Sequence, residues 1–247
     1  MDEAVELGEY LPLSFKSPNE QEYIAFLWDA FETNYVHEKY QFAFLAYHML
    51  TMSFVYFNIW QIKTMREEDF RKGMIGFGKD VEKKLLGASS PFTFSTVNER
   101  TILRFLKLIA CDNAMIGTYA KLVDDRNNSA HPNGHISPST QSAIDIKIRE
   151  ILRVVGEIQD QSRPVVEACY RQFLLESVDP DEREYADPPD QVREILVHKN
   201  YLSQRDIDIC LLLDPGKAVE KNRRPNAEAL HRALTDEYGE NAFRIPT

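Results

Sequence analysis

The stretch DDRNNSAHPNGH, residues 124–135, brings together polar and ionisable side chains that could bind or transform a substrate. Most of the remaining sequence has the pattern of amphipathic helices. Arg126 and His131 are its central pair. A histidine can give or take a proton near neutral pH, and an arginine offers a planar fork of N–H donors that fits phosphate oxygens. Together they could cut RNA without a metal, because one moves the proton of the attacking 2′-hydroxyl and the other stabilises the charge that develops on the phosphate.

The spacing indicates how the two side chains could meet. If the run is helical, Asn127 and His131 share a face, and Arg126 is offset from His131 by roughly 140° around the helix. The long arginine side chain can reach round that offset. Pro132 and Gly134 then end the helix, which leaves the histidine at an exposed edge where a substrate can approach.

The other polar residues of the stretch extend this candidate site. We predict Arg126 and His131 as the catalytic pair, with Asn127, Asn128 and His135 binding the substrate. Asn127 could also orient the imidazole. We expect no metal and no other cofactor, because this chemistry needs none and the sequence has no CxxC or Cys/His ligand spacing.

A second interpretation of the same residues is purely structural. Polar residues at a helix terminus are commonly caps and turn formers, so residues 127–129 could simply end the helix. Arg126 would then pair with a nearby aspartate such as Asp124, and His131 would be solvated.

The spacing alone has little specificity. An arginine followed by a histidine after four to six residues should occur roughly once by chance in a chain of this length. Two other pairs match, Arg193 with His198 and Arg224 with His231. The interior of the first is apolar, and a proline follows the arginine of the second. Residues 126–131 differ because a polar residue follows the arginine and small residues precede the histidine.

The run RNNSAHPNG, in a helical sequence and after a long apolar helix, resembles the Rx4-6H motif of the HEPN superfamily. The resemblance covers roughly residues 15–177, and only the motif is specific. It implies an up-and-down helical bundle that forms a homodimer, with two motifs facing each other across the interface. Many members are metal-independent RNases in toxin, phage-defence and RNA-processing systems, whereas others only bind.

Helices must position these residues, and hydrophobic spacings of three and four with local start and stop signals predict several of them. Ser17 followed by proline is a strong start signal, and Ser203 with Asp206 approximates a capping box at the start of the segment 204–213. The predicted helices cover residues 17–35, 40–62, 66–86 with a break near its glycines, 98–123, 137–158 and 164–177, and then three shorter segments at 190–198, 204–213 and 226–238.

The segment 40–62 contains no aspartate, glutamate, lysine or arginine, so its length could span a bilayer. Polar residues recur through it, and each would need a partner in hydrocarbon. We therefore predict a helix buried on nearly every side, in a bundle or at a dimer interface, rather than a membrane span. His48 in this segment is expected to be a core histidine with its hydrogen bonds satisfied.

Composition limits the class of protein. The chain has 247 residues, only 10 glycines and a formal net charge of −10, which argues against a sheet-rich fold, phosphate-cradling loops and broad electrostatic binding to nucleic acid. The cysteines Cys111, Cys169 and Cys210 have apolar neighbours, so we expect buried reduced thiols. The acidic N-terminal segment is unlike a signal peptide, and we expect a cytoplasmic protein.

These observations predict an all-α protein with a HEPN-like bundle at 15–177, an acidic proline-rich linker at 178–190 and a small helical appendage at 191–247. The expected function is a homodimeric, metal-independent endoribonuclease that acts on RNA, under the control of a regulatory protein partner if it belongs to a toxin or defence system. The alternative is a non-catalytic protein of the same fold that binds nucleotide, RNA or a protein partner.

Overall fold

The computed structural model describes residues 3–131 and 134–239, and it confirms the all-α prediction. No β-strand occurs among the described residues, where an isolated bridge joins Pro12 and Ser203. The α-helices are α1 (Pro18–Val36), α2 (Tyr40–Met65), α3 (Glu67–Gly73), α4 (Lys79–Leu86), α5 (Glu99–Ile102), α6 (Asn113–Ala130), α7 (Gln141–Ser177), α8 (Pro188–Gln191), α9 (Gln204–Leu211) and α10 (Arg224–Tyr238). The short helices of other types are Ala4–Tyr10, η2 (Pro91–Thr96), Leu103–Ile109, Pro215–Lys217, Lys221–Arg223 and the π-helix Val192–His198.

The chain divides into two compact units. Unit 1 comprises residues 1–8 and 17–162, and unit 2 comprises residues 9–16 and 163–247. The division therefore falls inside α7, whereas the sequence predicted a boundary at residue 177.

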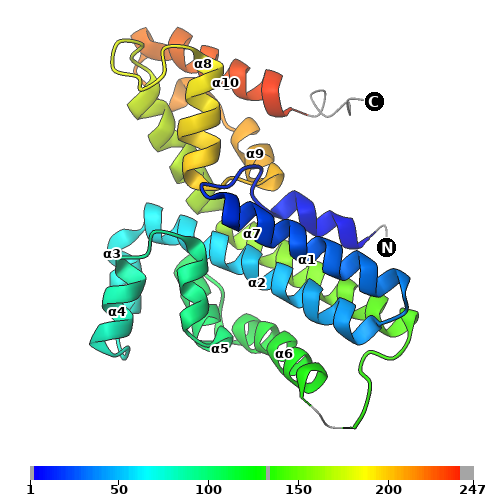
Figure 1. Cartoon of the computed structure of the whole chain (residues 1–247). Coiled ribbons are helices and arrows are strands. Elements are labelled where there is room, and N and C mark those ends of the chain that lie inside the picture. The colour runs from blue at the N-terminus through cyan, green and yellow to red at the C-terminus, as the bar shows by residue number, and fades with distance from the viewer. Residues whose placement is uncertain (1–2, 132–133, 240–247) are drawn as a thin grey trace. The chain divides into compact units, whose positions relative to one another are not determined.

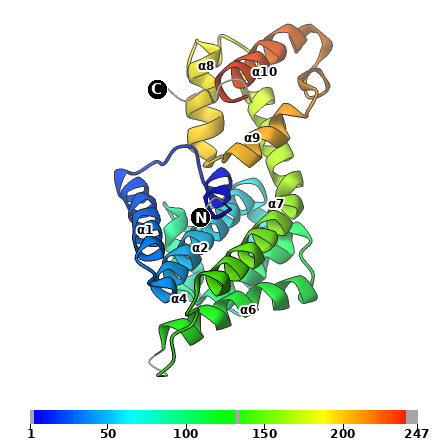
Figure 2. The same ribbon diagram turned by 90° about the vertical axis from the view of Figure 1, so that its right-hand side faces the viewer.

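Unit 1 is built on α1, α2, α6 and the first part of α7, which lie side by side in Figures 1 and 2. Tyr35 at the end of α1 donates a hydrogen bond to Asp145 near the start of α7, at 2.7 Å. Further along, Ser162 of α7 donates to Asn58 of α2. Lys147 of α7 binds the carboxylate of Asp125 near the end of α6. Tyr119, earlier on α6, donates to Glu157, later on α7, at 3.4 Å. These contacts show that α2 and α7 run parallel to each other, whereas α6 runs antiparallel to α7.

The core of unit 1 is centred on α2, which is buried along almost all of its length. The prediction of a helix buried on nearly every side is confirmed. This helix is long and apolar enough to cross a membrane, but 83% of its most apolar window is buried inside the protein. The predicted start of α1 is also confirmed, since the Ser17 hydroxyl accepts a hydrogen bond from the Asn19 N–H at 3.3 Å.

The prediction of one long helix over 98–123 is wrong. The chain forms α5, then a 3-10 helix at Leu103–Ile109, and then turns at Ala110, whose φ of 68° lies in the left-handed region. A new helix, α6, begins after Asp112, whose side chain accepts a hydrogen bond from the Met115 N–H at 2.9 Å. The apolar stripe continues across two helices of different direction, so periodicity alone did not reveal the turn.

Two helices predicted at 137–158 and 164–177 are a single helix, α7, which continues through Pro164. A proline inside a helix removes one backbone hydrogen bond and crowds the preceding turn, but packing on other elements can outweigh that cost. Val165 and Val166 after it are buried. The proline therefore did not end the helix as its usual effect predicted.

Unit 2 contains the end of α7 and the helices α8, α9 and α10. The predicted capping box at the start of α9 is confirmed, since Ser203 and Asp206 exchange backbone-to-side-chain hydrogen bonds. The segment 178–190, predicted as a linker, is tied back to α7: Arg183 donates to the Ser177 carbonyl, and Gln191 just after the segment donates to the Ser177 hydroxyl at 2.8 Å.

The three cysteines are buried and reduced, as predicted. Burial raises the pKa of Cys111 to about 11 and that of Cys169 to about 12, and it raises the pKa of Cys210 as well. Because only the thiolate reacts, we expect iodoacetamide at pH 8 to label the native protein at least about 100-fold more slowly than the unfolded protein. Mass spectrometry counts the adducts, and Ile75→Cys, at a position 88% exposed, is the matched positive control. Rapid native labelling of Cys111 or Cys169 would contradict this burial.

Candidate functional site

The last turns of α6 carry the candidate residues Arg126, Asn127 and Asn128, and ionic contacts hold this end of the helix to its neighbours in unit 1. Asp124 pairs with Arg100 of α5. Asp125 accepts a hydrogen bond from Lys147 of α7 at 2.6 Å. Consecutive acidic residues of one helix thus contact different elements, because neighbouring positions point about 100° apart around the axis.

Gln41, in the first turn of α2, makes a further contact at this end of α6. Its amide nitrogen donates to the Ser129 carbonyl, and its amide oxygen accepts from the Ser137 N–H at 3.3 Å. The Ser129 hydroxyl donates to the Asp125 carbonyl one turn earlier. Gln41 therefore links the start of α2 to both sides of the segment that contains His131 and His135.

Arg126 is held by a chain of three side chains from three helices. Its Nη2 lies 2.6 Å from Oε1 of Glu99, the first residue of α5. The other oxygen of Glu99, Oε2, lies 3.1 Å from Nε2 of His48 in α2. The exposed fractions of the three side chains are 30% for Arg126, 18% for Glu99 and 1% for His48. The chain of contacts thus runs from the surface into the core.

The two contacts determine the charge state of Glu99. Burial raises the pKa of this carboxyl, but the hydrogen bonds from His48 and Arg126 lower the pKa by more than burial raises it. The net pKa of Glu99 is therefore below its usual value. Tyr56 of α2 is close enough to interact electrostatically with Glu99 and Arg126, and its pKa is raised, first by burial and then by Glu99. Glu99 is consequently an ionised carboxylate at neutral pH.

The guanidinium of Arg126 keeps binding capacity beyond Glu99. Glu99 contacts Nη2, and in the described part of the chain Nε and Nη1 have no hydrogen-bond partner. Arginine carries five N–H donors in a fixed fork. A group held at one edge and partly exposed can receive a second anion at the remaining donors.

His131 is the C-terminal cap of α6, and its backbone N–H donates to the Asn127 carbonyl at 3.0 Å. Its side chain is exposed, as are the side chains of Asn128 and His135, and Asn127 is half-buried. The run through Ala130 is helical, which is the condition under which Asn127 and His131 share a face. Asn127 and Asn128 therefore lie in the last turn of α6 and His131 follows it directly, whereas His135 lies beyond the helix. The predicted helix-breaking role of Pro132 lies outside the described residues.

The structural interpretation named the wrong partner for Arg126. Asp124 pairs with Arg100, and Arg126 pairs with Glu99. The two partners, Arg100 and Glu99, are consecutive residues of α5. The same structural interpretation expected His131 to be solvated, which agrees with the exposure of the His131 side chain.

The two competing arginine–histidine pairs lie in unit 2 and have structural contacts. Arg193 is surrounded by carboxylates, including those of Asp190 and Glu237, and His198 Nδ1 lies 3.2 Å from the Ser14 hydroxyl. His231 Nδ1 lies 2.7 Å from the Tyr170 hydroxyl. Both histidines make hydrogen bonds to hydroxyl groups within unit 2, which makes the first pair a suitable negative control.

Sequence reasoning missed Glu99 and gave His48 only a core role. His48 is buried, as predicted, but one of its nitrogens contacts Glu99, and the other, Nδ1, is buried with no hydrogen-bond partner among the described residues. The expectation of fully satisfied hydrogen bonds is therefore wrong. A lone histidine within the apolar segment 40–62 was the available signal, whereas nothing near Glu99 in the sequence indicates its role.

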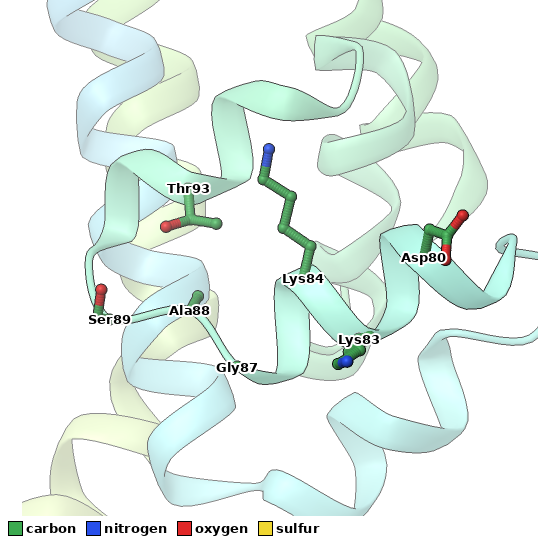
Figure 3. Close-up of a pocket in the computed structure, with 7 residues that line it drawn as sticks. All are labelled: Asp80, Lys83, Lys84, Gly87, Ala88, Ser89 and Thr93. Carbon is green, nitrogen blue, oxygen red and sulfur yellow. The ribbon is translucent and has the colours of Figure 1, made fainter.

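A separate open hollow of about 520 Å³ lies in unit 1 between α4 and the segment leading to η2 (Figure 3). Lys83, Lys84 and Asp80 of α4 line it together with Ser89 and Thr93. Figure 3 shows Lys84 extending away from α4 into the open space. None of the motif residues lines this hollow. Among the described residues, no group of three or more histidine, cysteine, aspartate or glutamate side chains is arranged to hold a metal ion.

Comparison of the chain with protein-family models, with curated protein sequences and with solved structures gave no match.

Proposed function

We propose that this protein is a metal-independent endoribonuclease of the HEPN type, with its up-and-down bundle in residues 15–177 and its site at the end of α6. The observation that supports it is the arrangement around Arg126: an edge-held, partly exposed guanidinium with unused donors, on the same helix as an exposed His131. Arg126 binds the phosphate, and His131 moves protons. Asn127, Asn128 and His135 contact the RNA.

The reaction needs no group other than these side chains. A base removes the 2′-hydroxyl proton, the 2′-oxygen bonds to the adjacent phosphorus, and the bond from phosphorus to the 5′-oxygen breaks as that oxygen gains a proton. The products are a 2′,3′-cyclic phosphate and a 5′-hydroxyl. The donors of Arg126 stabilise the extra negative charge on the phosphate oxygens. In a homodimer, a second copy of the motif adds further positive charge to a protein whose net charge is −10.

The test is incubation of the purified protein with a defined RNA in excess EDTA. We expect cleavage that is unaffected by the chelator and yields cyclic-phosphate ends, which resist direct 3′-end ligation until they are opened. His131→Ala, purified in parallel, controls for contaminating ribonuclease. The double variant Arg193→Ala/His198→Ala, in unit 2, should cleave like the wild type.

Cleavage that EDTA abolishes, or that both preparations share equally, would exclude the proposal. Binding of RNA with no cleavage would favour the rival function, a non-catalytic binding protein. Light scattering on the same sample tests the homodimer, and a strict monomer of 28.6 kDa would contradict a site composed of two motifs.

A further inference from the structure

His48 is a buried polar residue in an otherwise apolar part of the core. Its side chain is 1% exposed, and its ring lies 6.5 Å from that of Phe44, one turn earlier on α2. At that depth it cannot touch a substrate. A polar side chain in this position costs free energy unless it is hydrogen-bonded, and only one of its two nitrogens is. A role beyond packing would account for its presence.

The hydrogen bond that His48 does make determines where its hydrogen lies. An ionised carboxylate only accepts, so the Nε2 atom facing Glu99 carries the hydrogen and donates it. The donor is fixed in space because α2 is the most buried helix of unit 1, and close-packed interiors allow little movement.

Glu99 needs such an anchor. It begins α5, a helix of four residues whose start is capped by Asn98 accepting from the Thr101 N–H at 2.9 Å. A single helical turn has little stability of its own. With only Arg126 as a partner, two flexible side chains at the surface would define each other's position weakly. With His48 as the third member, the position of the Glu99 carboxylate is fixed relative to the buried helix α2.

We infer that His48 is a positioning residue that acts through Glu99 to fix the guanidinium of Arg126 in the orientation that receives a phosphate. This inference rests on the proposed ribonuclease function for its catalytic consequence, but the geometry it concerns can be measured without RNA. Glu99 contacts Nη2 of Arg126 and thereby restricts rotation of the guanidinium. The remaining N–H donors of Arg126 then keep one direction. Fixed donors cost no reorganisation when the transition state forms.

The experiment compares His48→Gln with His48→Leu. The glutamine amide nitrogen can take the place of Nε2 and donate to Glu99, whereas leucine has a similar volume and no donor. We expect His48→Leu to lower the cleavage kcat by roughly 10- to 100-fold, since a misplacement of about 1 Å near a reacting centre has an effect of that order. His48→Gln should stay within about threefold of the wild type, and KM should change little in both.

A second measurement does not depend on cleavage. In protein labelled with ¹⁵N-arginine, the Arg126 side-chain N–H signals are assigned by their loss in Arg126→Lys, and their exchange with water is measured. We expect faster exchange in His48→Leu and wild-type exchange in His48→Gln. If His48→Leu does not fold, His48→Asn replaces it, because its amide nitrogen corresponds to Nδ1 and cannot reach Glu99.

The two readouts separate the possible failures. Equal Arg126 exchange in the donor and non-donor variants would overturn the positioning role, whether or not the protein cleaves RNA. The expected difference in exchange, with no cleavage by the wild type, would support the positioning role and reject the ribonuclease function. Equal loss of kcat in both His48 variants would also overturn the inference, because it would show that the hydrogen bond is irrelevant to the rate.

Discussion

His131→Ala is expected to lower the rate of RNA cleavage by about 10²- to 10⁴-fold, the range that a positioned proton donor or acceptor contributes. The side chain is exposed at the C-terminal end of α6, so the free energy of unfolding should change by less than about 0.5 kcal/mol. Single-turnover cleavage of a defined RNA measures the first quantity, and chemical denaturation measures the second.

The combination of a large kinetic effect with unchanged stability distinguishes chemistry from packing. His198→Ala is the matched control, because this histidine shares the arginine–histidine spacing but contacts Ser14 in unit 2. It should leave the cleavage rate unchanged. A His131→Ala protein that cuts RNA at the wild-type rate would show that the wrong histidine was assigned.

Glu99→Gln is expected to lower the free energy of unfolding by about 1–3 kcal/mol at pH 7, the usual worth of hydrogen bonds to a charged group. The substitution keeps the shape of the side chain but removes the charge that accepts from His48 and attracts Arg126. Arg126 then loses its only ionic partner among the described residues. Urea denaturation of both proteins gives the difference, with Glu32→Gln, an exposed carboxylate of α1, as the control.

The stability difference should also depend on pH, with a sign determined by the pKa of Glu99. Burial raises that pKa, but the hydrogen bonds from His48 and Arg126 lower it by a larger amount. The pKa in the folded state is therefore below the ordinary carboxyl value of about 4.3. The stabilisation is therefore fully present above that ordinary value and is lost as the pH falls through the lowered one. Wild type and Glu99→Gln should converge in acid. A constant difference between pH 7 and pH 3 would contradict the ion-pair assignment.

The elements that the sequence predicted correctly depend on local signals. Ser17 followed by proline marks the start of α1, and the capping box of Ser203 and Asp206 marks the start of α9. The burial of α2 follows from a segment with no charged residue. Each of these signals is contained within a few residues or one helix, so no knowledge of the partner elements is needed.

The errors arise where tertiary packing overrides a local preference. Ala110 adopts a left-handed conformation that alanine rarely favours, which divides the predicted helix 98–123 into separate pieces. Pro164 has the opposite outcome, because the long helix α7 continues through it. Neither residue shows its effect in the sequence, since the energy that decides it comes from contacts with other helices.

The sequence by itself determined the all-α class and placed the candidate residues in one polar stretch, but its predicted helix ended at residue 123, so the helical conformation of Arg126 to Ala130 was established only by the structure. Only the tertiary structure decided which carboxylate holds Arg126. Asp124 is the nearer acid along the chain, but helical rotation directs it to Arg100, while Glu99 meets Arg126 through the packing of α5 on α6. His48 joins them from a third helix, and side chains so distant in sequence converge only because the hydrophobic core places their backbones together.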